Sequence, residues 1–334
     1  MLDSGESAQI EARVRYFLAL SQLQLGRPDR ARSHLDASRN YYETTRDAER
    51  LVECMATEIS YANVTRSPDA VEIGRHALAC CRRLKPVPTM LEVRILNMLA
   101  SAYVDACAWT EAVDACERAL ELAGPLFDLK RQARLFGDIG IAYKELGLLD
   151  RALRYGTRAV ALLEVTREPV MLAWAENCLG YTLLATGDLV AARQHLERSL
   201  ALHEETGVEV MKSHLLLSLC ELSLAEGRPD AARDWARRAL ELAARLGERS
   251  AGAQAHHWLG KIAADAGDAA TSDAEFAEAL RGWSALGAKE WLARCHELYG
   301  DVLQKRGDLG EANAQLKMAV AVRSGARPNP LDVI

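Results

Sequence analysis

Histidine and cysteine side chains in the last third of the sequence are the first candidates for chemistry, because both residue types can bind a metal ion. His256 and His296 lie 40 residues apart, with His257 and Cys295 beside them. No H-E-x-x-H motif and no carboxylate completes a ligand set. These positions pack in the interior of the helical pattern described below, so hydrogen-bonded interior histidines explain them better. We therefore expect no bound metal and no cofactor.

The cysteines are the second candidates, since a thiolate can act as a nucleophile or a redox sensor. They contain no C-x-x-C pair, and their spacing is typical of reduced thiols in a cytoplasmic protein. Cys116 and Cys220 fall where the pattern requires small packed residues, so we expect packing rather than thiol chemistry. The eight cysteines are Cys54, Cys80, Cys81, Cys107, Cys116, Cys178, Cys220 and Cys295.

Sequence motifs for catalysis are missing. The chain has no G-x-S-x-G, no G-x-x-x-x-G-K-[ST] phosphate loop and no G-x-G-x-x-G after a strand. We therefore expect that the protein is not an enzyme.

Charge and hydropathy exclude two further classes of function. The formal net charge is −6, and the 41 basic and 47 acidic residues are mixed along the chain, which disfavours direct binding to nucleic acid. The first residues lack the features of a signal peptide, and no apolar run is long enough to cross a bilayer. We expect a cytoplasmic protein that does not contact a membrane.

Glycines at a fixed interval define the elements that would position any site. One set recurs every 40 residues and is followed five positions later by alanine or serine; a second set keeps the same interval. Two breaks per period predict two helices, and a fixed period predicts an array that grows by stacking. The first set is Gly147, Gly187, Gly227, Gly267 and Gly307, and the second is Gly207, Gly247 and Gly287.

Within each period the first helix carries a stripe of large residues with a small one among them. Phe136, Ile139 and Tyr143 stand at i, i+3 and i+7, and Gly140 stands at i+4. The residue at i+4 stays small in six consecutive units, which predicts a close approach of the neighbouring helix. Aromatic residues make up only 6% of the chain and no strand pattern competes, so an all-helical fold is expected.

The second helix of each period begins with capping residues. Asp188, Asp268 and Asp308 follow the turn glycines and are placed to accept hydrogen bonds from free amides. Pro28 and Pro229 fall in the first turn, where proline is tolerated.

The combined pattern, L/F-x-x-L-G-x-x-Y/L, a turn glycine and A-x-x-x-F/L-x-x-A-L, resembles the tetratricopeptide repeat. The resemblance covers nearly the whole chain. It implies an all-α, right-handed superhelical solenoid of about eight antiparallel helix hairpins over residues 1–323, followed by a tail over residues 324–334. The unit near Ala70 fits less well, because Glu58 falls on the small position in one register and a turn glycine is missing. Hairpins are expected around Ala31, Ala70, Ala112, Ala152, Ala192, Ala232, Ser272 and Ala312.

Two departures from the family pattern narrow the resemblance. The usual unit has about 34 residues, whereas this one has 40, and the signature tryptophan of the first helix is replaced. The 40-residue version, with phrases such as TGDLVAARQHLERSLAL, resembles the repeat domains of bacterial transcriptional activators and of STAND-type signalling ATPases. This implies the sensor or regulatory part of a bacterial regulator. Met1 lies just before the first expected helix, so an effector domain upstream of it in the parent protein is a hypothesis that the sequence leaves open. The replacing residues are Phe136, Glu176, Leu216, His256 and His296.

In tetratricopeptide proteins the first helices of successive units line a concave face, so the resemblance implies a ligand there. Trp174, Asn177 and Tyr181 combine aromatic surface with an amide, which suits an extended peptide. For any one of these residues, a polar face that only contacts water is the simpler explanation. The candidate partner-binding residues are Arg94, Asn97, Arg134, Lys144, Trp174, Asn177, Tyr181, His214, Glu221, His257, Lys261 and Arg294.

Three hypotheses for function remain at this stage. The first is a non-catalytic module that binds a protein or peptide in the concave groove and serves in regulation. The second is a structural scaffold that forms a homodimer through its terminal hairpins, because the last hairpin leaves Met318, Val320 and Val322 without a following repeat unless the tail folds back over them. The third is RNA binding by a helical-repeat code, which the acidic balance disfavours.

Overall fold

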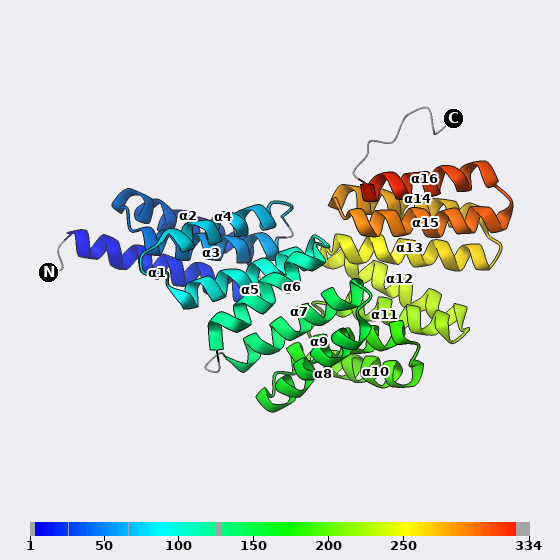
Figure 1. Cartoon of the computed structure of the whole chain (residues 1–334), viewed down its shortest axis with the longest axis horizontal. Helices are drawn as coiled ribbons and strands as arrows, with labels where there is room; N and C mark the ends of the chain where they lie inside the picture. Colours follow the sequence, from blue (N-terminus) through cyan, green and yellow to red (C-terminus); the bar gives the residue numbers. More distant parts are fainter. Residues whose placement is uncertain (1–3, 26, 66, 125–127, 325–334) are drawn as a thin grey trace. The chain divides into compact units, whose positions relative to one another are not determined.

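The computed structural model describes residues 4–25, 27–65, 67–124 and 128–324, and these residues form sixteen α-helices (Figure 1). No strand occurs in this part of the chain. The helices follow the eight expected hairpins in order, and the poorly fitting unit around Ala70 also contains two helices. The prediction of an all-α fold is confirmed. None of the described helices is both long enough and apolar enough to cross a bilayer.

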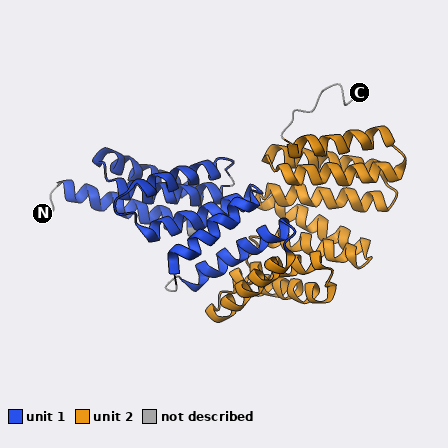
Figure 2. Cartoon of the chain, viewed as in Figure 1, with its two compact units in different colours: residues 1–148 blue, residues 149–334 orange. Residues whose placement is uncertain are grey.

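The chain divides into two compact units, residues 1–148 and 149–334 (Figure 2). The boundary falls in the turn of the hairpin around Ala152, and a single continuous domain over residues 1–323 stays a prediction. Residues 325–334 of the expected tail lie outside the described residues. The first unit contains α1 (Ser4–Gln24), α2 (Pro28–Thr45), α3 (Ala48–Val64), α4 (Ala70–Arg83), α5 (Thr89–Asp105), α6 (Trp109–Ala123) and α7 (Leu129–Glu145). The second contains α8 (Leu149–Thr166), α9 (Pro169–Thr186), α10 (Leu189–Thr206), α11 (Lys212–Ala225), α12 (Pro229–Leu246), α13 (Arg249–Asp265), α14 (Ala269–Leu286), α15 (Lys289–Arg306) and α16 (Leu309–Ser324).

The periodic glycines end helices in the left-handed conformation. Gly187 follows α9 with φ of 82°, and Gly207 follows α10 with φ of 65°. Residues with a Cβ atom rarely adopt this conformation, which explains why glycine recurs there. The prediction of two helix breaks per period is confirmed.

The small residues of the first helices allow a neighbouring helix to approach. A Cβ atom added at Gly180 would lie 2.8 Å from the Leu196 side chain, and one added at Gly260 would lie 3.0 Å from the Phe276 ring. Real Cβ atoms essentially never come closer than the latter distance. The second helix of each of these hairpins therefore packs where the sequence pattern places the gap.

The predicted aspartate caps are present at two second helices. Asp188 accepts a hydrogen bond from the Ala191 amide at 3.0 Å, and Asp268 accepts one from the Thr271 amide at 3.1 Å. Pro28 and Pro229 stand in the first turn of α2 and α12. The Asp308 carboxylate accepts a hydrogen bond from Arg306.

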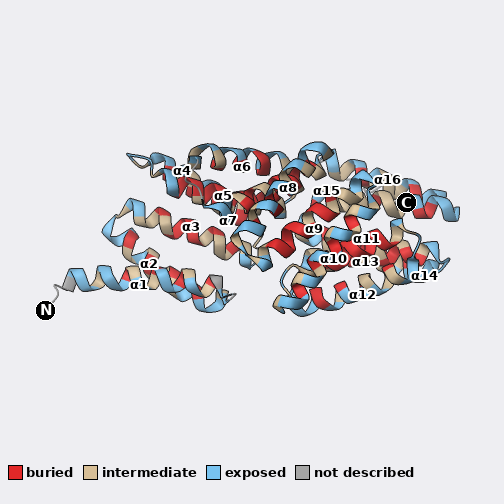
Figure 3. Cartoon of the chain, turned by 90° about the horizontal axis from the view of Figure 1, so that it is seen from below, coloured by how far each residue is buried: buried red, intermediate tan, exposed pale blue. Residues whose placement is uncertain are grey.

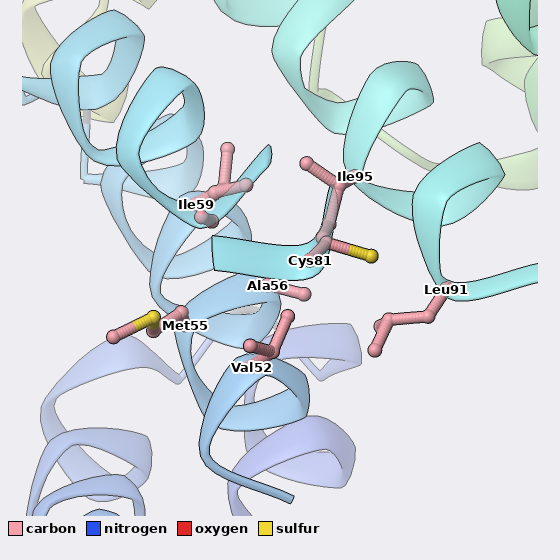
Figure 4. Close-up of a cluster of buried hydrophobic side chains, with 8 residues drawn as sticks. Val52, Met55, Ala56, Ile59, Cys81, Leu91 and Ile95 are labelled. Atoms are coloured by element: carbon pink, nitrogen blue, oxygen red, sulfur yellow. The ribbon is translucent and has the colours of Figure 1, made fainter. Parts of the chain in front are cut away.

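The core is shared between consecutive hairpins. Figure 4 shows one cluster of buried apolar side chains, which come from α3, α4 and α5. In this cluster one hairpin covers its apolar face with the first helix of the next one, as expected of stacked repeats. The labelled residues of this cluster are Val52, Met55, Ala56, Ile59, Cys81, Leu91 and Ile95.

Candidate functional site

In the first unit the first helices α1, α3, α5 and α7 are successive neighbours. Arg94 of α5 donates hydrogen bonds to the Tyr16 hydroxyl at 2.9 Å and to the Glu53 carbonyl oxygen at 3.3 Å. These bonds tie α5 to α1 and α3. A ligand that recruits Arg94 would have to break them.

Arg134 of α7 belongs to a polar cluster with Ser101 and Asp138. Its guanidinium donates to the Ser101 hydroxyl at 3.2 Å and to the Asp138 carboxylate at 3.3 Å, and the Ser101 hydroxyl donates to Asp138 at 3.0 Å. Burial raises the pKa of Asp138, while the charge of Arg134 opposes that rise. The Arg134 side chain is still 41% exposed and remains accessible. The other two candidates in this unit are Asn97, which is half-buried, and Lys144, whose ammonium lies 2.8 Å from the Glu145 carboxylate.

In the second unit the first helices α9, α11, α13 and α15 are likewise successive neighbours. We call the face that carries their candidate residues the first-helix face of the second unit. Trp174 and Asn177 on α9 are buried, at 6% and 9% exposure, and Tyr181 and His214 are half-buried. Of the two aromatic residues that the sequence suggested for ligand binding, Trp174 is therefore buried and Tyr181 is the more accessible.

One polar contact on this face connects neighbouring helices, and others lie within a helix. Gln254 of α13 donates an amide hydrogen bond to the Glu221 carboxylate of α11 at 3.3 Å. Arg294 of α15 bonds Glu290 at 3.1 Å. Its guanidinium also lies 5.2 Å from the centre of the Trp291 ring, a cation–π distance. The face therefore combines an amide, carboxylates and a stacked cation within one unit.

Two buried polar atoms on this face have no hydrogen-bond partner among the described residues. They are the Asn177 Oδ1 and the His257 Nδ1. An unmet buried polar group costs about 1–3 kcal/mol, and native proteins keep few of them. Burial, with a smaller contribution from the nearby Arg294 charge, lowers the pKa of His257 to about 4. His257 is therefore neutral near pH 7 and can donate or accept a hydrogen bond.

Lys261, the remaining candidate, forms an ion pair with Asp265 one turn later on α13. The set of candidate residues leaves out Gln254 and Trp291. The position of Gln254 in the repeat does place it on the predicted concave face, beside His257 and Lys261. The stacking of Trp291 on Trp283, with ring centres 5.3 Å apart, is a tertiary contact that no local pattern indicates.

The histidines that suggested a metal pair bond other side chains. His256 Nδ1 lies 2.6 Å from a Glu275 carboxylate oxygen, and His296 Nδ1 lies 2.6 Å from the Gln315 side-chain oxygen. His296 is buried and His256 is half-buried. Across the described part of the chain, no group of three or more histidine, cysteine, aspartate or glutamate side chains is placed to hold a metal ion.

Family models of the tetratricopeptide repeat match residues 12–37, 91–164 and 171–245, which together make up more than half of the chain. The chain belongs to the tetratricopeptide repeat family. No curated protein matches the sequence.

Solved structures with the same fold cover nearly the whole chain. A Rap protein complexed with competence and sporulation factor has a TM-score of 0.72 at 12% identity, over 95% of this chain and 96% of its own. The Rap conjugation gene regulator of plasmid pLS20, in complex with the Phr* peptide, has a TM-score of 0.57 at 12% identity, over 95% and 96%. The apo quorum sensor NprR of B. thuringiensis has a TM-score of 0.57 at 10% identity, over 94% and 99%. These similarities establish a solenoid of the tetratricopeptide type.

Proposed function

We propose that this protein is a non-catalytic interaction module that binds a peptide or a segment of a partner protein on the first-helix face of its second unit. In this proposal it is the sensor or regulatory part of a bacterial regulator and acts in the cytoplasm, without direct contact to nucleic acid. Conformational change would pass between neighbouring hairpins, because each repeat contacts only its neighbours.

The observation that carries the proposal is the pair of unmet polar atoms on that face. An extended peptide presents an amide donor and a carbonyl acceptor at each residue. Asn177 and His257 can each complement such groups, and Gln254 can exchange its bond to Glu221 for one to a ligand. A bound backbone would then satisfy groups that the free protein leaves unpaired.

Charged groups on the same face suit an acidic side chain or a terminal carboxylate. Lys261 and Arg294 are half-buried and bond Asp265 and Glu290 within their own helices. Ion pairs of this kind, exposed in part, contribute little to stability, so a ligand carboxylate can compete for them. A ligand carboxylate that accepts two hydrogen bonds from the Arg294 guanidinium would also be held in one orientation.

The comparisons support a peptide as the ligand. Two of the similar structures are complexes, one with competence and sporulation factor and one with the Phr* peptide. A solenoid with this fold therefore accommodates such ligands.

Asn177→Leu provides a sharp test, because it removes the amide while keeping the volume of the side chain. It also removes an unmet buried polar group, so we expect stability to be unchanged or raised by about 1 kcal/mol. A library of random peptides displayed on phage is selected on the wild-type chain, and the enriched peptides are titrated against wild type, Asn177→Leu and Glu278→Gln. Glu278 lies on the exposed surface of α14 and serves as the control.

We expect peptides that bind wild type and Glu278→Gln equally and bind Asn177→Leu at least tenfold more weakly. Equal binding by all three proteins would contradict the location of the site. Failure to enrich any peptide would contradict the class of ligand.

A further inference from the structure

A cavity of about 270 Å³ lies in the second unit, where residues of α13, α14 and α15 and of the turn between α13 and α14 come together. The first turn of α14 forms part of its wall. Figure 3 shows both exposed and buried residues along this helix. An apolar cavity of about 150 Å³ can hold a benzene molecule, so the larger cavity has room for a small ligand.

In the α9–α10 hairpin two leucines fill the equivalent space. Leu184 and Leu189 pack against the apolar cluster of that hairpin. Two periods later the same two positions hold Ala264 and Ala269, which line the cavity. Alanine has a much shorter side chain than leucine, so the replacement of both leucines leaves space that is not refilled. Leucine stands at the position of Ala269 in three other hairpins, as Leu149, Leu189 and Leu309.

Ser272 places a polar group in the wall of the same cavity. It is fully buried, and its hydroxyl has no hydrogen-bond partner among the described residues. A buried hydroxyl without a partner is unfavourable, and packing alone would favour alanine. The serine therefore indicates a polar occupant in the one hairpin where it occurs. The residues at this position in the other hairpins are Ala31, Ala70, Ala112, Ala152, Ala192, Ala232 and Ala312.

One ammonium group in the lining is uncommitted. Lys305 of α15 is exposed and forms no hydrogen bond or ion pair with another residue in the described part of the chain. The other charged side chains of the lining are paired, because Arg306 bonds two aspartates and Asp265 bonds Lys261. The cavity thus joins space for an aliphatic group to one free positive charge. Mostly apolar pockets with a few polar groups are typical of small-ligand sites.

We propose that this cavity binds an aliphatic carboxylate of about the size of leucine. The branched chain occupies the space that two leucines fill in the α9–α10 hairpin, and the carboxylate accepts a hydrogen bond from the Lys305 ammonium. The preference for an aliphatic group follows from the residues that the array lacks here. The preference for an anion follows from the unpaired lysine.

This chemistry has two sources, the last residue of a peptide and a free amino acid. Ala264 lies three residues after Lys261 on α13, so the cavity adjoins the first-helix face of the second unit. A peptide on that face could therefore end in the cavity. A free amino acid would need a partner for its ammonium, and Asp265 in the lining is an acceptor. The cavity site does not depend on the proposed peptide function.

Saturation-transfer-difference NMR of the full chain tests the proposal with N-acetyl-leucine, leucine and N-acetyl-leucinamide as probes. N-acetyl-leucine copies the last residue of a peptide, and the amide lacks the carboxylate. We expect at least one carboxylate to bind wild type with a dissociation constant on the order of 1 mM, and the amide to bind at least tenfold more weakly. Tighter binding of N-acetyl-leucine assigns the site to a peptide end, and tighter binding of leucine assigns it to a free amino acid.

Ala269→Leu should abolish this binding, because it restores the leucine of the other hairpins and fills the cavity. Its helicity should be unchanged. Ala270→Leu is the matched control, since it adds the same side chain at the next, exposed position of α14 outside the lining and should bind as wild type does. Lys305→Gln should weaken binding of the carboxylates about fivefold. Lys317→Gln on the exposed surface of α16 should not.

Asn177→Leu, which tests the proposed peptide function, should bind the probes as wild type does. The reason is that α9 packs against α8, α10 and α11, whereas α13, α14 and α15 line the cavity. Failure of the two proposals would therefore appear in different variants. No saturation transfer to either carboxylate, equal binding of the amide, binding that persists in Ala269→Leu, or equal loss in Ala270→Leu would each overturn the cavity site.

Discussion

His195 and Glu176 form a hydrogen-bonded pair between the two helices of one hairpin, with His195 Nδ1 2.6 Å from a carboxylate oxygen of Glu176. The Glu176 side chain is fully buried, and the Arg198 guanidinium lies 2.7 Å from its other oxygen. Two hairpins further on, the same two repeat positions hold His256 and Glu275, also 2.6 Å apart, with the residue types exchanged. The position where the family carries a signature tryptophan has thus become a polar link between helices.

The hairpin between them shows how an apolar pair fills the same positions. There Leu216 belongs to an apolar cluster, and Trp235 packs against that cluster. His195→Ala alone should lower the free energy of unfolding by about 1–3 kcal/mol, because it leaves a buried carboxylate short of a partner. The double variant Glu176→Leu with His195→Trp should recover most of that loss, since an apolar pair needs no hydrogen bonds. Urea denaturation followed by circular dichroism measures both; a double variant no more stable than His195→Ala would contradict this account.

Stability should fall in mild acid because of His257. Its pKa is lowered by burial to about 4, below the unfolded value of about 6.5, so the unfolded chain takes up a proton that the native state does not. The contribution of His257 to the free energy of unfolding is fully present above pH 6.5 and is lost as the pH falls toward 4. It is of the order of 2–3 kcal/mol. Burial also lowers the pKa of His203 and His296, which act in the same direction.

Thermal melting of wild type and His257→Leu at several pH values measures this effect. The variant should melt at a temperature that changes less between pH 7 and 4.5 than that of wild type. Identical pH dependence in the two proteins would exclude His257 as a cause.

Two glycine-to-alanine substitutions on first helices should have opposite effects on the free energy of unfolding. At Gly180 a new Cβ atom would lie 2.8 Å from the Leu196 side chain and 3.2 Å from the Ala192 carbonyl oxygen, so we expect a loss of about 1–3 kcal/mol. At Gly252 in α13 no atom beyond the adjacent backbone of the same helix lies within 4 Å of the new Cβ, and alanine should stabilise the helix by about 0.5–1 kcal/mol. Chemical denaturation of the two variants and of wild type measures both changes in the free energy of unfolding. A stabilised Gly180→Ala protein would mean that the hairpin can open without cost.

The cysteines should separate into two groups by reactivity. Burial raises the pKa of Cys54 and Cys81 to about 11 and of Cys295 to about 12, and it also raises that of Cys116 and Cys220. A protonated, buried thiol is a poor nucleophile. Brief treatment of the native protein with iodoacetamide at pH 7.5, followed by peptide mass spectrometry, should therefore find label on the three half-buried residues and little elsewhere. Those three are Cys80, Cys107 and Cys178.

Labelling of all eight cysteines after unfolding in guanidinium is the control for this experiment. Rapid native labelling of Cys116 or Cys220 would contradict the assignment of these two residues to packing.

The surroundings of the candidate site residues were harder to predict than the fold. The resemblance placed Arg94 and Trp174 on a ligand-binding face, but Arg94 bonds Tyr16 and Glu53, and Trp174 is 6% exposed. Position in the repeat indicates which face of a helix a residue occupies. It does not indicate whether a long side chain reaches a partner on another helix or lies under its neighbours.

The sequence by itself determined the helices, their turns and their close approaches. A left-handed turn at Gly187, a cap at Asp188 and a gap at Gly180 depend on backbone conformation and on residues a few positions away, so their signals are local. Only the tertiary structure decided which residues at the same position of different repeats are buried. Val14 of α1 and Ala255 of α13 occupy the same place in the repeat, yet Val14 is 51% exposed and Ala255 is fully buried. The difference arises because burial depends on which helix packs against a residue, and in a solenoid that helix belongs to another repeat.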